Sequence, residues 1–257
     1  MDDDELRQTQ RRRLDATVRW AGSLRTTLGP VLERHGDRVH FRPSSTGVSM
    51  IGLLPGRPQR GKSGLTHLDA VVADFEALFA RHCRDIEHGR VTGEKALQSH
   101  LIREAYLHGR HMVSLNDASR VTPEPVDLLF VTDEISLPLR AGKIVCDVLA
   151  LRCDGARSTP VLIELKDQRL LTRLVEQLDG FAALLDEHAD RFASLFGALF
   201  GRDVRFDGPA EKWLVWPAAG PGPDPREEEL ASKGIRVAGY DEHDGAYVMR
   251  VGRPPIR

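Results

Sequence analysis

Apolar and charged positions alternate along the chain in a pattern that predicts an α/β protein. Two nearly unbroken apolar runs, IVCDVLALRC (144–153) and PVLIELK (160–166), flank an Asp-Gly pair at Asp154. Such runs are typical of strands buried on both faces, and Asp-Gly is a strong turn signal. We therefore expect a β-hairpin here, followed by a helix that includes LVEQLDGF (174–181).

Three charged residues, Asp147, Glu164 and Lys166, lie inside these apolar strands. Burying a charge without a partner costs several kcal/mol, so the three positions need an explanation. Side chains of a strand alternate between its two faces, so Glu164 and Lys166 share one face. A register that sets Asp147 opposite Glu164 or Lys166 brings the three together, whereas a one-residue slip sends Asp147 to the other face. The sequence permits both registers, and we predict the first.

Two carboxylates beside one ammonium group form a hard, oxygen-rich site that suits Mg²⁺ or Mn²⁺ rather than zinc. The expected metal ligands are Asp147, Glu164 and the main-chain carbonyl of Leu165. The cation would lower the pKa of a bound water and neutralise charge that develops on a phosphate. Lys166 would orient that water or help to deprotonate it. This chemistry suits phosphodiester hydrolysis, and the alternative is a structural cluster of salt bridges.

The pattern Asp147…Glu164-Leu165-Lys166 resembles the PD-(D/E)XK nuclease superfamily of restriction, repair and defence endonucleases. The resemblance covers residues 91–251 approximately, and Cys146 stands where the family name has proline. It implies a restriction-endonuclease-like mixed β-sheet flanked by helices. It also implies a metal-dependent endonuclease or exonuclease that acts on nucleic acid, with DNA as the expected substrate.

The resemblance gives a role to an acidic residue on the helix before the hairpin. Glu94, in the expected helix GEKALQSHLIREA, lies in line with Leu97, Leu101 and Ala105, so it faces the core. The alternative is an acidic residue that only complements the helix dipole in the first turn. Glu104 is the substitute candidate, although it lies at the edge of the apolar stripe.

The resemblance also gives a role to a glutamine on the helix after the hairpin. Gln177 and Phe181 are similar to a Gln-Leu-x-x-Tyr helix signature, with Phe in place of Tyr. We therefore expect Gln177 at the catalytic site together with Asp147, Glu164 and Lys166. The alternative for Gln177 is a solvated position on the helix.

The first 90 residues have a different pattern, and we expect an accessory region, mainly helical, before a nuclease-like domain over 91–257. The sequence does not predict its role. The further elements that the pattern predicts are a helix over 4–34, strands over 39–43 and 47–54, a Gly/Pro-rich loop over 55–64, a helix over 66–82, and a strand pair over 126–134 and 135–140.

The segment from Gly56 to Ser63 matches the phosphate-binding pattern GxxxxGK[ST], between an apolar strand and a helix. With LLFVTDE (128–134) as a metal-binding acidic strand, it gives a P-loop NTPase as an alternative function. Against this, Gly64 stands where the helix should begin, and the chain up to the hairpin is short for a nucleotide-binding sheet. We expect Lys62 and Ser63 to lie in an exposed loop without a nucleotide. Another alternative is a non-catalytic module that keeps the nuclease fold and binds nucleic acid or protein.

Composition narrows the class of protein further. A hydrophobic content of 41% and a charged content of 29% indicate an ordinary globular protein, with neither a membrane span nor a secretion signal. Three cysteines without a CxxC pair favour a reducing, cytoplasmic location. A net charge of −2 excludes a uniformly basic surface, so nucleic acid needs a local basic patch. We expect that patch near the hairpin, at Arg152, Arg169 and Arg173, and leave a homodimer open.

Overall fold

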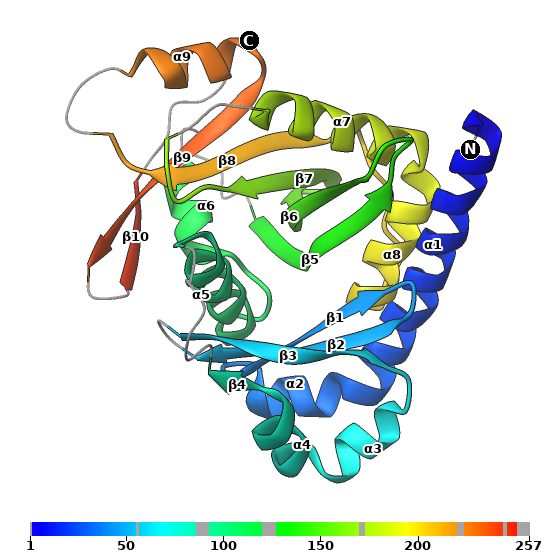
Figure 1. The fold of residues 1–257 in the computed structure, drawn as a ribbon. Coiled ribbons are helices and arrows are strands. Elements are labelled where there is room, and N and C mark those ends of the chain that lie inside the picture. The colour runs from blue at the N-terminus through cyan, green and yellow to red at the C-terminus, as the bar shows by residue number, and fades with distance from the viewer. Residues whose placement is uncertain are drawn as a thin grey trace.

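The computed structural model describes residues 2–54, 57–85, 93–119, 127–169, 173–219, 224–243 and 246–250. It is an α/β structure with a large mixed sheet, a smaller antiparallel sheet and flanking helices (Figure 1). The large sheet has the order β10-β9-β8-β7-β6-β5. Its strands are β5 (Asp127–Pro138), β6 (Lys143–Asp154), β7 (Arg157–Leu165), β8 (Glu211–Pro217), β9 (Ile235–His243) and β10 (Ala246–Arg250).

Strand directions make the large sheet mixed, as the resemblance implies. Strands β5, β6 and β7 are antiparallel neighbours, β8 and β9 run parallel to β7, and β10 returns antiparallel to β9. The expected strand pair over 126–140 is wrong, because β5 is one strand whose pairing with β6 continues from Asp127 to Pro138. It has an irregular register between Phe130 and Thr132 and a positive φ at Glu134. These irregularities bend the strand without ending it.

Helices cover both faces of the large sheet and enclose an apolar core on each (Figure 1). Residues of β7 alternate between the two cores, with Leu162 in one and Val161 and Ile163 in the other. This is the period-two alternation of a strand buried on both faces. The core of Leu162 is covered by α1 (Asp3–Ser23), α7 (Leu174–Glu187) and α8 (Ala189–Phe200), and the other by α5 (Gly93–Leu107) and α6 (Val113–Ser119). Helix α9 (Pro225–Ser232) packs along β9.

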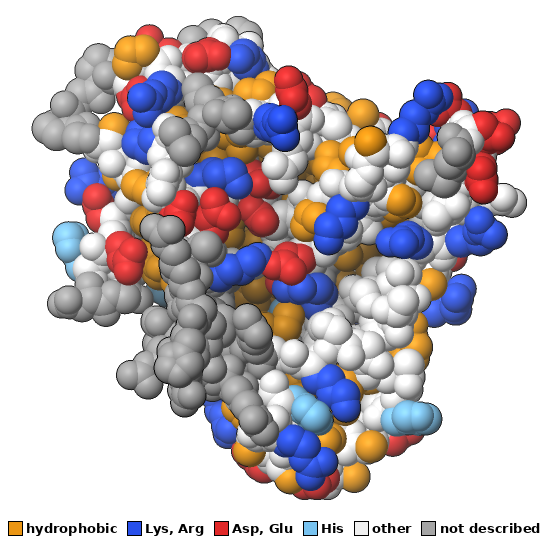
Figure 2. All heavy atoms as spheres, in the orientation of Figure 1, with side chains coloured by type: hydrophobic (Ala, Val, Ile, Leu, Met, Phe, Trp, Pro, Cys, Tyr) orange, Lys and Arg blue, Asp and Glu red, His pale blue; other side chains and the backbone are white. Residues whose placement is uncertain are grey.

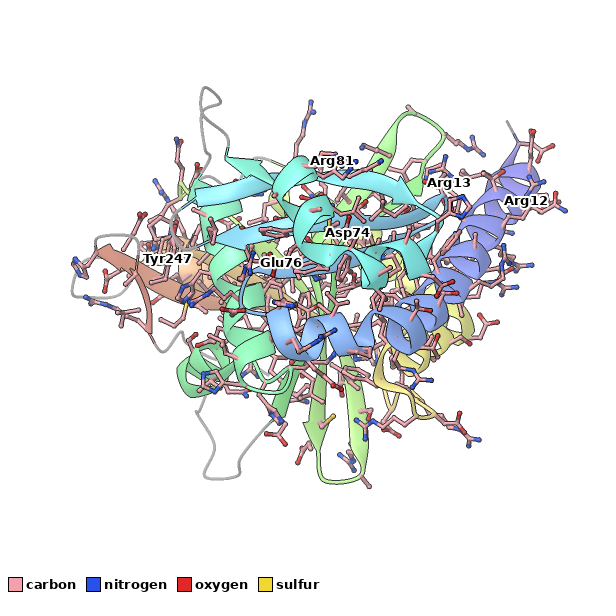
Figure 3. All side chains as sticks on the ribbon, turned by 90° about the horizontal axis from the view of Figure 1, so that it is seen from below. Arg12, Arg13, Asp74, Glu76, Arg81 and Tyr247 are labelled. Carbon is pink, nitrogen blue, oxygen red and sulfur yellow. The ribbon has the colours of Figure 1, made fainter. Side chains whose placement is uncertain are left out.

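The N-terminal region forms the second sheet, in the order β1 (Val39–Ser44), β2 (Gly47–Leu54), β3 (Arg57–Leu65) and the two-residue β4 (Arg84–Asp85). The expected first helix is present, but α1 passes through a π-helical turn (Leu24–Leu28) into α2 (Gly29–His35). The expected helix over 66–82 breaks at Asp74, between α3 (Leu68–Ala73) and α4 (Phe75–His82) (Figure 3).

Residues of the first helix lie in the same apolar core as residues of the large sheet. Leu14 and Ala21 belong to one buried cluster with Leu149 and Leu162. Helix α1 also packs along α8, at the end of the molecule where Figure 3 shows Arg12 and Arg13 pointing outward. The division into an accessory region and a nuclease-like domain stays a prediction, but the first helix is packed against the sheet that holds the hairpin.

The stretch that was expected to be an exposed loop is a strand from Arg57 onward. β3 begins at Arg57 and pairs antiparallel with β2, from Leu54 opposite Arg57 to Val48 opposite Leu65. Lys62 and Ser63 are exposed, as expected, but they lie on an extended backbone, and Gly56 falls outside the described residues. A phosphate-binding loop needs main-chain N–H groups that converge on one anion before a helix. The strand does not provide that arrangement.

Gly61 has a structural explanation in this strand. A Cβ at this position would lie 1.4 Å from the main-chain oxygen of Met50 on β2, so the two strands can approach only because residue 61 is glycine. We expect Gly61→Ala to lower the free energy of unfolding by about 1–3 kcal/mol or more, measured by urea denaturation. The matched control is Ser63→Ala at an exposed position, expected within about 0.5 kcal/mol of wild type. Equal midpoints for the two variants would contradict this pairing of β2 and β3.

Candidate active site

The hairpin of β6 and β7 has the register that brings the predicted charges together. Its pairs run from Asp154 opposite Arg157 to Val148 opposite Ile163. One step further in the same register, Asp147 lies opposite Glu164. The ladder ends at this point, because the main-chain N–H of Leu165 donates to Oδ2 of Asp147 at 2.9 Å. The carboxylate of Asp147 therefore takes the place of a main-chain acceptor.

Glu164 is the buried centre of the site, with 2% of the residue exposed. Its Oε1 accepts a hydrogen bond from Lys166 Nζ at 2.8 Å and another from Gln177 Nε2 at 2.9 Å. Lys166 Nζ also donates to the carbonyl oxygen of Leu165 at 3.0 Å and lies 3.6 Å from Oε1 of Glu94. All five predicted catalytic residues, from two strands and two helices, thus meet at one end of the hairpin.

The two flanking helices place their polar residues as the resemblance implies. Glu94 lies in the first turn of α5, whose residues Leu97, Leu101 and Ala105 are buried as predicted. The substitute candidate, Glu104, points elsewhere, because its Oε1 accepts from the main-chain N–H of Ser114 at 3.1 Å. On the other face of the sheet, the side chain of Gln177 also donates to the carbonyl of Val145 at 3.0 Å. Gln177 is therefore held between β6 and β7 and is not a solvated helix residue.

The charges of the site are strongly coupled. Burial raises the pKa of Glu164 and the nearby carboxylate of Asp147 raises it further, to about 7, although Lys166 opposes this shift. Burial by itself would lower the pKa of Lys166, but the charges of Glu164, Asp147 and Glu94 outweigh burial and raise it. Lys166 is therefore an ammonium group at neutral pH. A buried carboxylate beside a second carboxylate is a place where a bound cation would stabilise the charged form.

The residues at the site fit a hard cation with few protein ligands. Asp147 and Glu164 offer carboxylate oxygens, and the carbonyl of Leu165 reaches the same place, since Lys166 Nζ contacts both it and Glu164. Among the described residues, no group of three or more His, Cys, Asp or Glu side chains is arranged to hold a metal ion. A cation here would take its remaining ligands from water or substrate, as Mg²⁺ commonly does.

Two of the three arginines expected to bind nucleic acid are engaged within the chain, so the geometry does not support that role for them. Arg152 pairs with Glu211 at 2.8 Å, near the turn of the hairpin and away from Asp147. Arg169 pairs with Asp224 and Glu227, and its guanidinium stacks over Trp216. These contacts tie β8 and α9 to the hairpin. Arg173 is exposed before α7, and its role in binding nucleic acid stays a prediction.

A second cluster of buried charges, which the sequence did not predict, lies beside the site. Asp133 is 1% exposed and accepts hydrogen bonds from His40 Nε2 at 2.8 Å and from Arg42 Nε at 2.7 Å. Burial alone would raise the pKa of Asp133, but the charges of Arg42 and His40 outweigh it and lower the pKa below its ordinary range. His40 Nδ1 also contacts the hydroxyl group of Tyr106 at 2.8 Å. Asp133 is therefore not the metal-binding acid of an NTPase, because its oxygens are taken by an arginine and a histidine.

Gln98 connects this cluster to the site. Its Nε2 donates to Asp133 Oδ2 at 3.2 Å and to the main-chain oxygen of Asp147 at 3.0 Å. The sequence does hold a signal for it, because Gln98 lies one turn after Glu94 on the buried stripe of α5, among Leu97 and Leu101. A polar residue on an apolar stripe calls for a buried partner. Figure 2, drawn in the orientation of Figure 1, shows acidic and basic side chains close together on the face toward the viewer, between the two sheets.

Comparison with protein-family models, with curated proteins and with solved structures found no match. Among the described residues, no helix combines the length and the apolar character needed to cross a membrane. The three cysteines, Cys83, Cys146 and Cys153, are unpaired thiols.

Proposed function

We propose that the protein is a metal-dependent nuclease with a restriction-endonuclease-like fold. It hydrolyses phosphodiester bonds, and DNA is the proposed substrate. The observation that carries the proposal is the buried carboxylate of Glu164, opposite Asp147 and hydrogen-bonded to Lys166 and Gln177. The order of elements also supports it, because an antiparallel β5-β6-β7 unit lies between α5 and α7 and is followed by the parallel strand β8. Burying these charges without a function would cost stability.

The side chains divide the chemistry among them. Asp147, Glu164 and the carbonyl of Leu165 would hold Mg²⁺ or Mn²⁺, which supplies an activated water and neutralises phosphate charge. Lys166, as an ammonium group, donates hydrogen bonds and offsets negative charge in the transition state. Gln177 fixes the Oε1 atom of Glu164 through its 2.9 Å hydrogen bond. This division assigns no base to Lys166, because the surrounding carboxylates raise its pKa.

The test is nicking of supercoiled plasmid DNA by the full chain with Mg²⁺ or Mn²⁺, and with a chelator as the control. Glu164→Gln is the matched variant, because glutamine has the same size and length as glutamate and can still accept a hydrogen bond, but it has no charge. We expect nicking by wild type only with the cation, and a loss of at least about 10²-fold in the variant. Labelled single-stranded DNA and RNA are tested in parallel.

Each of the other outcomes would favour a different catalytic site or a different function. Undiminished nicking by Glu164→Gln would place catalysis elsewhere in the chain. An inactive wild-type protein on all of these substrates would contradict the proposal and favour a non-catalytic binding module. ATP hydrolysis that is lost in Lys62→Ala would instead favour an NTPase, against the strand geometry of β3.

A further inference from the structure

Asp147 lies beside an irregular main chain on both sides of β6. Toward β7, the ladder ends at the pair of Val148 and Ile163. Toward β5, Asp133 pairs with Val148 and Ile135 pairs with Cys146, while Glu134, which lies between them, has a φ of +44°. A left-handed conformation at a residue other than glycine costs free energy and is found where the surroundings impose it. The carbonyl of Asp147 accepts a hydrogen bond from a side-chain donor outside the sheet.

Gln98 is that donor. Its Nε2 lies 3.0 Å from the main-chain oxygen of Asp147 and 3.2 Å from Asp133 Oδ2, and its Oε1 accepts from Lys95 Nζ at 2.8 Å. The acceptors Asp133 and Asp147 face the NH₂ group of Gln98, and the ammonium group of Lys95 faces its oxygen, so the Gln98 amide has only one orientation that satisfies all three bonds. The side chain is buried, with 4% of the residue exposed, so water does not replace these bonds easily.

The strand β1 of the N-terminal sheet holds this arrangement in place. Arg42 donates to both carboxylate oxygens of Asp133 and, through Nη1, to Glu134 Oε2 at 2.6 Å. Lys95 also contacts Glu134. The N-terminal sheet thus fixes Asp133 and the irregular residue Glu134, and Asp133 in turn orients Gln98 toward Asp147.

We propose that Gln98 is a positioning residue that holds the main chain of Asp147 so that its carboxylate meets Glu164 around a cation. The proposal rests on the proposed nuclease function. Because Asp147 Oδ2 is bonded to the N–H of Leu165, a shift of the Asp147 main chain weakens that bond and moves the carboxylate away from Glu164. Partners of metal ligands typically change metal affinity or activity by about 10- to 100-fold.

The experiment replaces Gln98 by methionine, which has a similar length and no donor. Three quantities are measured: the exchange rate of the Leu165 amide by NMR, the Mn²⁺ dissociation constant by calorimetry, and the nicking rate as a function of Mn²⁺ concentration. We expect faster exchange at Leu165 and a Mn²⁺ dissociation constant raised by about 10- to 100-fold. Most of the lost nicking should return at saturating Mn²⁺, because Gln98 acts through a ligand. Should Gln98→Met not fold, Gln98→Asn shortens the buried amide and is measured in the same way.

Gln10→Met is the matched control. Gln10 is a glutamine with 2% exposure whose Nε2 donates to the carbonyl of Pro138 at 2.9 Å and whose Oε1 contacts His188. Pro138 is the last residue of β5, beyond Asp133 and Glu134, so this variant loses comparable bonds at a place that contacts neither Gln98 nor Asp147. We expect lower stability but an unchanged Leu165 exchange rate and unchanged Mn²⁺ affinity.

The outcomes separate the two proposals. If wild type binds Mn²⁺ and nicks DNA while Gln98→Met matches Gln10→Met in all three quantities, the role of Gln98 is overturned and the nuclease function stands. If wild type neither binds Mn²⁺ nor cleaves, the nuclease function fails, and the role of Gln98 toward a cation fails with it.

Discussion

Replacing Lys166 by alanine is expected to lower the rate of plasmid nicking by about 10² to 10⁴-fold and to leave Mn²⁺ binding largely intact. The ammonium group contacts Glu164, the carbonyl of Leu165 and Glu94, so it lies at the site without being able to ligate a cation. Its loss removes a hydrogen-bond donor and a positive charge from the transition state. Replacing Asp147 by alanine should instead remove both metal binding and cleavage, because a carboxylate ligand is lost.

Calorimetric titration with Mn²⁺, beside cleavage of a plasmid and a labelled oligonucleotide, distinguishes the two variants. Lys212→Ala is the matched control for Lys166, because Lys212 is also half-buried and also pairs with a carboxylate, that of Asp179, at 2.7 Å. The carboxylate of Asp179, unlike that of Glu164, is exposed. The Lys212→Ala variant should retain full nicking activity. Undiminished cleavage by Asp147→Ala would rule out this site as the catalytic centre, and loss of Mn²⁺ binding in Lys166→Ala would make Lys166 a structural part of the cation site.

The hairpin could be predicted from the sequence because its signals are local. The Asp-Gly turn at Asp154 and the apolar runs on either side fix two strands, and few registers close so short a turn. The period-two rule limits the outcome to two arrangements, and the register that the structure shows is the one in which Asp147 meets Glu164. Glu94 and Gln177 needed a resemblance as well, because each comes from a helix whose place on the sheet depends on packing.

The parts that could not be predicted depend on contacts between distant segments. Asp133 meets Arg42 and His40 across more than 90 positions of the chain, and the spacing of these residues gives no sign of it. The segment 55–64 was interpreted as a loop because glycine and proline are frequent in it, yet from Arg57 onward it is the strand β3, paired with β2. Close approach of two strands requires a glycine at Gly61, and composition alone cannot separate that requirement from a turn.

The largest effect on stability is expected for Asp133→Asn, at about 3–5 kcal/mol of the free energy of unfolding at pH 7. Asparagine keeps the shape but leaves the charge of Arg42 without its buried partner. It also replaces one of the two acceptor oxygens with an NH₂ group, which then faces donor groups of the surrounding side chains. The matched control is Asp179→Asn, whose carboxylate pairs with Lys212 at an exposed position and should cost less than about 1 kcal/mol.

The pH dependence of the free energy of unfolding provides a second test of the buried charge on Asp133. The folded protein lowers the pKa of Asp133 below its ordinary value of 3.8, so the unfolded chain takes up this proton first as the pH falls. The stabilisation by Asp133 is therefore complete above pH 3.8 and decreases as the pH falls below it. We expect the difference in urea midpoint between wild type and Asp133→Asn to be constant from pH 7 to pH 5 and to shrink toward pH 3. A difference that stays constant down to pH 3 would mean that Asp133 is not the charged partner of Arg42, and the anchor of Gln98 would then need another explanation.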